Sequence, residues 1–142
     1  MTGRLNDKVD VRNAIAPNTG PTGALTGIAV NATGFSRARF IFSFAANSNT
    51  SAALSAGMGI YQASTSGATF TAITNASLAA TTSGILGSNT MVIDVPTSAG
   101  TPWLKVSGGS VLSAAIANSC VVELYNGVNN PPTQSAQQVV VV

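Results

Sequence analysis

The chain has 142 residues and a very small charge content, with six Lys or Arg, four Asp or Glu and no His. That length suits one domain with a single core. The absence of His excludes a Ser–His–Asp or Cys–His catalytic arrangement, and the few scattered cations do not form the cluster that nucleic-acid binding requires. No apolar run approaches the roughly 20 residues of a membrane span.

Residues 1–16 hold half of the charged side chains, and we expect an extended arm that becomes the first strand near Val9. A four-residue spacing of the cations would also suit a short helix, but Val9 and Val11 alternate with charged neighbours as in a strand. The arm also lacks the apolar stretch of a secretory signal, which predicts synthesis in the cytoplasm. Its cations are candidate contacts to an acidic partner: Arg4, Lys8 and Arg12.

The segment Arg37–Phe44 alternates without a break and is the predicted central strand of the core. Its three Phe side chains fall on one side, where they could bury roughly 450–750 Å² between them. Arg37 and Arg39 fall on the other side, where they should face solvent or a partner.

Turn residues separate the other predicted strands, which are 25–30, 57–62, 68–73, 91–95, 101–106 and 119–125. The turns are 17–23, 31–34 and 64–67, and the last of them should close a hairpin. Residues 45–56 and 74–89 lack a period and indicate long connections, although 45–56 could instead form a short helix. About eight strands without an amphipathic helix predict an all-β fold, a single-domain antiparallel β-sandwich, and the long connections favour a jelly roll.

The tail, residues 128–142, ends in four consecutive valines: Val139, Val140, Val141 and Val142. Such a segment suits adding a strand to a sheet edge, either its own or a neighbour's. We therefore divide the one domain into an N-terminal arm with the first strand (1–16), a β-sandwich core (17–127) and a C-terminal arm (128–142).

The sequence predicts no catalytic residue, no metal site and no cofactor. The acids are scattered, and Asp94 and Glu123 should instead meet Arg37, Arg39 or Lys105 across a sheet. The lone Cys120 lies in an apolar run, as a buried and inert thiol does. Three aromatic residues should point away from the core, where they could stack on sugars, anchor a protein interface or be covered by a loop: Tyr61, Trp103 and Tyr125.

Several stretches, in this order, resemble the capsid cement or decoration proteins of tailed bacteriophages. They are Ala14–Pro17, Gly27–Phe35, Ala38–Phe40, Ser64–Phe70, Val92–Pro96 and Trp103–Val106. The resemblance implies a jelly-roll-like sandwich that forms homo-oligomers, dimers or trimers, and clamps neighbouring major capsid proteins. The family supplies no catalytic residues.

The sequence therefore predicts a structural virion protein, not an enzyme, on the outer surface of a capsid, made in the host cytoplasm. Its partners would be the major capsid protein and itself, without direct nucleic-acid or membrane contact. The candidate contacts are Arg4, Lys8, Arg12, Arg37, Arg39, Trp103 and Val139 to Val142. The alternative is a β-sandwich binding module, a fibre, adhesin or carbohydrate-binding domain, that uses Trp103 and the tyrosines.

Overall fold

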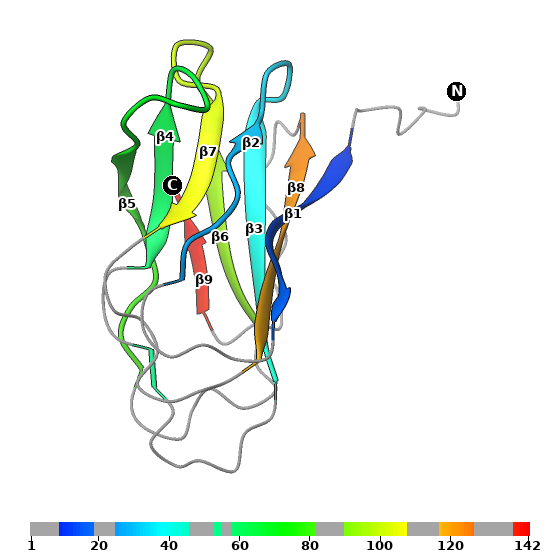
Figure 1. Ribbon diagram of the computed structural model, residues 1–142, viewed down its shortest axis with the longest axis vertical. Coiled ribbons are helices and arrows are strands. Elements are labelled where there is room, and N and C mark those ends of the chain that lie inside the picture. The colour runs from blue at the N-terminus through cyan, green and yellow to red at the C-terminus, as the bar shows by residue number, and fades with distance from the viewer. Residues whose placement is uncertain are drawn as a thin grey trace.

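A computed structural model describes residues 9–18, 25–45, 53–54, 58–81, 90–107, 117–126 and 138–142, and these residues form strands and no helix. The strands run roughly along the long axis of the molecule in two layers (Figure 1). They are β1 (Asp10–Asn18), β2 (Val30–Asn31), β3 (Arg37–Phe44), β4 (Gly59–Ala63), β5 (Thr71–Ser77), β6 (Thr90–Pro96), β7 (Trp103–Ser107), β8 (Asn118–Tyr125) and β9 (Gln138–Val141).

The two sheets have the strand orders β1-β8-β3-β6-β9 and β2-β7-β4-β5. Four antiparallel pairs join the first strand to the eighth, the second to the seventh, the third to the sixth and the fourth to the fifth. A single long hairpin that is rolled into two sheets produces this nested pairing, which is the topology of a jelly roll. The predicted fold class is confirmed, with β9 as a ninth strand.

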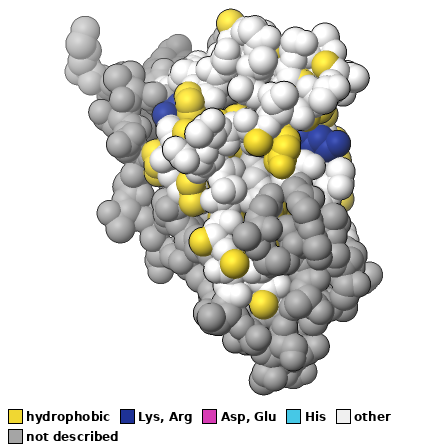
Figure 2. Space-filling model, turned by 90° about the vertical axis from the view of Figure 1, so that its left-hand side faces the viewer, with side chains coloured by type: hydrophobic (Ala, Val, Ile, Leu, Met, Phe, Trp, Pro, Cys, Tyr) yellow, Lys and Arg dark blue, Asp and Glu magenta, His cyan; other side chains and the backbone are white. Residues whose placement is uncertain are grey.

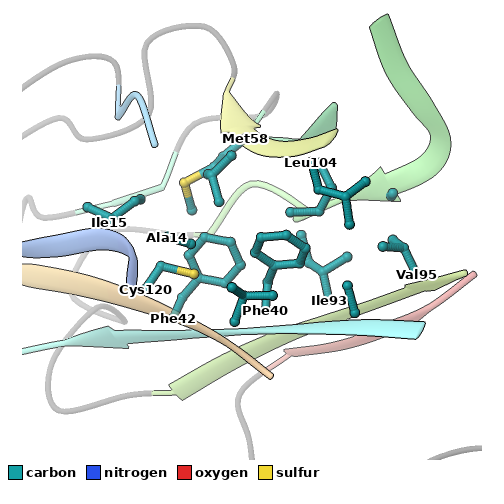
Figure 3. Packing of buried hydrophobic residues seen from close by; sticks show 14 of the residues in the cluster. Ala14, Ile15, Phe40, Phe42, Met58, Ile93, Val95, Leu104 and Cys120 are labelled. Carbon is teal, nitrogen blue, oxygen red and sulfur yellow. The ribbon is translucent and has the colours of Figure 1, made fainter. Parts of the chain in front are cut away.

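β3 lies at the centre of the five-stranded sheet because its alternation buries one whole face. Phe40 is fully buried and faces Ile93 of β6 and Val122 of β8 in the register. Figure 3 shows the rings of Phe40 and Phe42 between the sheets, with Met58 and Leu104 approaching from the opposite layer. The central-strand prediction is therefore confirmed.

Several of the predicted boundaries are wrong. The strand expected at 68–73 is β5 (Thr71–Ser77), which therefore includes residues 74–77 of the expected connection. The turn at 17–23 was expected to end the first strand, yet β1 continues through Pro17 to Asn18. A proline is tolerated there because β1 is an edge strand and its pairing with β8 shifts register after Ile15. The strand predicted at 25–30 shrinks to Val30–Asn31, since the preceding residues bond to both layers: Gly27 N donates to Val106 O and Ile28 N to Ala14 O.

Gly27 lies where the segment before β2 passes closest to β1 and β7. A Cβ atom added there would sit 2.8 Å from the oxygen of Ala14 and 3.0 Å from Cβ of Val106. We expect Gly27→Ala to lower the free energy of unfolding by about 1–3 kcal/mol, because the neighbouring backbone must move.

The control for this prediction is Gly67→Ala, since nothing lies within 4 Å of a Cβ at that position. It should leave stability within about 0.5 kcal/mol of the parent protein. Chemical denaturation of the two variants tests the comparison, and equal stabilities would contradict the close approach at Gly27.

Candidate functional site

The outer face of the five-stranded sheet carries a cluster of charged side chains centred on Asp94. In the register, Arg39 of β3 lies between Asp94 of β6 and Glu123 of β8. Asp94 accepts hydrogen bonds from Arg37 Nε (2.7 Å), Arg39 Nε (3.2 Å) and the Tyr125 hydroxyl (2.5 Å). Arg39 Nη1 also donates to Glu123 Oε2 (3.2 Å). We call these five residues the Asp94 cluster.

The sequence prediction that the mid-strand acids meet cations across the sheet is confirmed for Arg37 and Arg39. It is wrong for Lys105, which lies on β7 in the other sheet. Arg37 and Arg39 point away from the core as expected, but their side chains are only 16% and 17% exposed. Little guanidinium surface is therefore left for a partner.

The cluster is a saturated ionic network rather than a reactive site. Burial alone would lower the pKa of Arg37 and Arg39, but their hydrogen bonds to Asp94 and Tyr125 and the attraction of the neighbouring acidic groups outweigh it and raise the pKa of both. Burial, followed by the bond to Asp94, also raises the pKa of the Tyr125 hydroxyl. Asp94 itself is fully buried, so no substrate can reach its carboxylate.

The C-terminal strand is held by the same cluster. β9 pairs in parallel with β6, the strand that carries Asp94, and the own-sheet alternative is therefore the one this chain adopts. Val142 N donates to the main-chain oxygen of Asp94 (2.9 Å), and Arg37 Nη2 donates to the main-chain oxygen of Val142 (3.1 Å). Val140 and Val142 pack against the core, whereas Val141 is 44% exposed.

Arg37→Ala should loosen β9 without unfolding the sandwich. A hydrogen bond to a charged group contributes about 1.5–3 kcal/mol, so amides 138–142 should exchange with deuterium about tenfold faster or more. Mass spectrometry of the C-terminal peptide measures this. Arg12→Ala is the control, because Arg12 is on β1 at the opposite edge, and equal exchange in the two variants would contradict the contact.

The N-terminal cations are only partly within the described residues. Arg12 binds Asp10 through Nε (2.8 Å) and Nη2 (2.5 Å), and its Nη1 donates to Asn31 O (2.9 Å). Its side chain is 41% exposed, so it remains accessible to a partner. Arg4 and Lys8 lie outside the described residues, as does the side chain of Val139.

The three aromatic residues do not form one surface. Trp103 (β7) and Tyr61 (β4) share the outer face of the four-stranded sheet, whereas Tyr125 belongs to the Asp94 cluster on the other layer. Phe70, which lies in the predicted hairpin, joins the first pair, and Lys105 Nζ lies 5.5 Å from its ring centroid. Figure 2 views the β5 side and shows hydrophobic side chains in separate patches, with Lys or Arg atoms beside some of them.

A pocket of about 250 Å³ opens at the end of the sandwich where the β2–β3 and β6–β7 turns meet. Phe35 and Pro102 supply apolar surface, and hydroxyl groups come from Thr33, Ser36 and Ser98. None of the residues that line it is titratable, so the pocket offers shape and hydroxyl groups without an acid or a base to activate them.

Within the described part of the chain, no three acidic or cysteine side chains come together as a metal site would require. Cys120 is buried, and that burial raises the pKa of its thiol. None of the described segments forms a helix that is long and apolar enough to cross a membrane. No protein-family model, curated protein or solved structure matches this chain.

Proposed function

We propose that this protein is a structural component of a virus particle that binds the outer surface of a tailed-phage capsid and cements neighbouring major capsid proteins. The observation that carries the proposal is the nested pairing of β1 with β8, β2 with β7, β3 with β6 and β4 with β5. It is the jelly roll that the resemblance to decoration proteins implies. The resembling stretches fall largely on this frame, from the end of β1 to β7.

The arrangement of charges supports a role by contact rather than by chemistry. The carboxylates of Asp10, Asp94 and Glu123 all bind arginine side chains. A weakly charged surface repels copies of itself little, which suits a protein that packs beside its own copies as a dimer or trimer. A specific contact needs about 1,600 Å² of buried surface, and repetition over a shell adds avidity.

In this mechanism the sandwich, including β9, is a rigid body, and the N-terminal arm reaches the shell. Packaged DNA strains the boundaries between capsid subunits, and each added contact across a boundary opposes their separation. Arg4, Lys8 and the exposed Arg12 would meet acidic capsid surface, and Val141 offers an apolar contact beside the Asp94 cluster. The protein would be made in the host cytoplasm and end up on the particle exterior.

Removal of residues 1–8 tests the arm in this mechanism, since it deletes Arg4 and Lys8 and leaves β1 intact from Asp10 onward. We expect shells of the major capsid protein from the same genome to bind the truncated protein about tenfold more weakly or worse, and the loss to shrink at high salt. Co-sedimentation at several protein concentrations measures occupancy. Unchanged occupancy would remove the arm from the mechanism.

A further inference from the structure

The outer face of the four-stranded sheet carries a row of aromatic side chains around one small residue. Ala63 of β4 pairs with Trp103 of β7, and one step beyond the Gln62–Thr71 pair it meets Phe70 on its other side. Ala63 is only 3% exposed and does not belong to the core cluster. A methyl group on an outer sheet face needs larger neighbours to cover it, and Trp103 and Phe70 flank it.

Lys105 is the cation of this face. It lies opposite Tyr61 and places its ammonium group 5.5 Å from the centroid of Phe70. Among the Lys and Arg side chains that the structure describes, Arg12, Arg37 and Arg39 bind carboxylates and Lys105 does not. The acids in the described ranges, Asp10, Asp94 and Glu123, all lie on the other sheet.

These features indicate the chemical class of ligand that suits this face. Trp103 is on β7 and Phe70 comes directly before β5, the strands on either side of β4, so their Cα atoms are about two strand spacings, or 9–10 Å, apart, close to the length of a disaccharide. The negative face of an aromatic ring attracts the C–H groups of a pyranose. A single lysine suits one carboxylate, whereas a nucleic acid would need several cations along its phosphates.

We propose that this face, which we call the aromatic face (Tyr61, Ala63, Phe70, Trp103 and Lys105), binds an extended oligosaccharide that carries an acidic sugar. Trp103 stacks on one sugar ring, and Lys105, whose ammonium group lies over the Phe70 ring, binds the carboxylate of a sugar two units along. The Asn31 side chain, opposite Trp103 in the register, adds a neutral polar group at the rim. This function goes beyond capsid binding, because the Asp94 cluster and β9 lie on the other sheet.

A glycan array with neutral, uronic-acid and sialic-acid oligosaccharides tests the proposal with the full-length protein. We expect signals confined to carboxylate-bearing glycans, lowered about tenfold or more by Trp103→Ala and by Phe70→Ala. Lys105→Gln, which does not touch the core, should lower the same signals and abolish their dependence on salt. Val11→Ala, which changes an exposed residue of β1 on the opposite sheet, is the control and should bind as the parent protein does.

Three results would overturn the proposal: no glycan bound, neutral glycans bound as well as acidic ones, or signals that survive both aromatic substitutions. Shell occupancy measured on the same variants separates this proposal from the cementing function. If the parent protein binds no glycan and Trp103→Ala reduces shell binding, the aromatic face belongs to the capsid contact instead.

Discussion

Replacing Asp94 by alanine should lower the free energy of unfolding by about 3–5 kcal/mol, because it leaves the largely buried guanidinium group of Arg37 without a carboxylate and that of Arg39 with Glu123 alone. Arg37 and Arg39 are 16% and 17% exposed, so water can replace few of the hydrogen bonds that they lose with the Asp94 carboxylate. The Tyr125 hydroxyl loses its acceptor as well. Asp94→Asn, which keeps an acceptor oxygen, should lose less.

Asp10→Ala is the matched control, since Asp10 also binds an arginine but its side chain is 39% exposed. An exposed ion pair contributes about 0–1 kcal/mol, so this variant should remain near the parent protein. Urea denaturation of both variants at neutral pH measures the difference. Equal losses would show that the Asp94 cluster is no more important for stability than a surface ion pair.

Phe40→Ala should cost about 3–5 kcal/mol of stability, since it removes a fully buried ring between the sheets and leaves a cavity. The neighbours of Phe40 in the register, Ile93 and Val122, come from two different strands and cannot both move inward without disturbing the sheet. The expected result is a lower denaturation midpoint with a two-state transition preserved.

Phe70→Ala serves as the comparison for Phe40, because its ring lies on the outer aromatic face and is partly exposed. Its loss of stability should be clearly smaller than that of Phe40→Ala, which would also make it a usable variant for glycan binding. If Phe70→Ala were the more damaging change, the assignment of the core to the Phe40 side of the sheets would be wrong.

The local alternation of the sequence was sufficient to predict where most of the strands lie. The alternation of Arg37–Phe44 identifies its buried and exposed sides without knowledge of the neighbouring strands. The hairpin of β4 and β5 follows from a turn between two short apolar runs. The nested strand order of the sheets could not be predicted, because it depends on pairings such as β1 with β8, which lie a hundred or more positions apart in the chain. Neither local period nor turn chemistry carries that information.

The candidate site was predicted in part for the same reason. Outward-facing Arg37 and Arg39 followed from alternation, and their acidic partners followed from the shortage of other charges. That one carboxylate, Asp94, would serve both arginines depends on strand register. Phe70 was missed because it fell inside the predicted strand 68–73 without a side of the sheet assigned to it. β5 begins only at Thr71, and the place of Phe70 beside Ala63 appears only once β4 and β5 are aligned.

The four consecutive valines predicted that β9 adds to a sheet edge. They left open whether that sheet is the chain's own or a neighbour's. Parallel addition to β6 is possible because a long connection separates β9 from β8. The choice of its own sheet rests on contacts that only the folded protein assembles, above all the bonds of Val142 with Asp94 and Arg37.

Rupture of the particle under heat tests the cementing role most directly. Particles stripped of this protein should release their DNA at a lower temperature than intact ones, and re-addition of the purified protein should restore the original temperature. Protein that lacks residues 1–8 should restore it only at much higher concentrations. Stripped particles that rupture at the same temperature as intact ones would contradict the account.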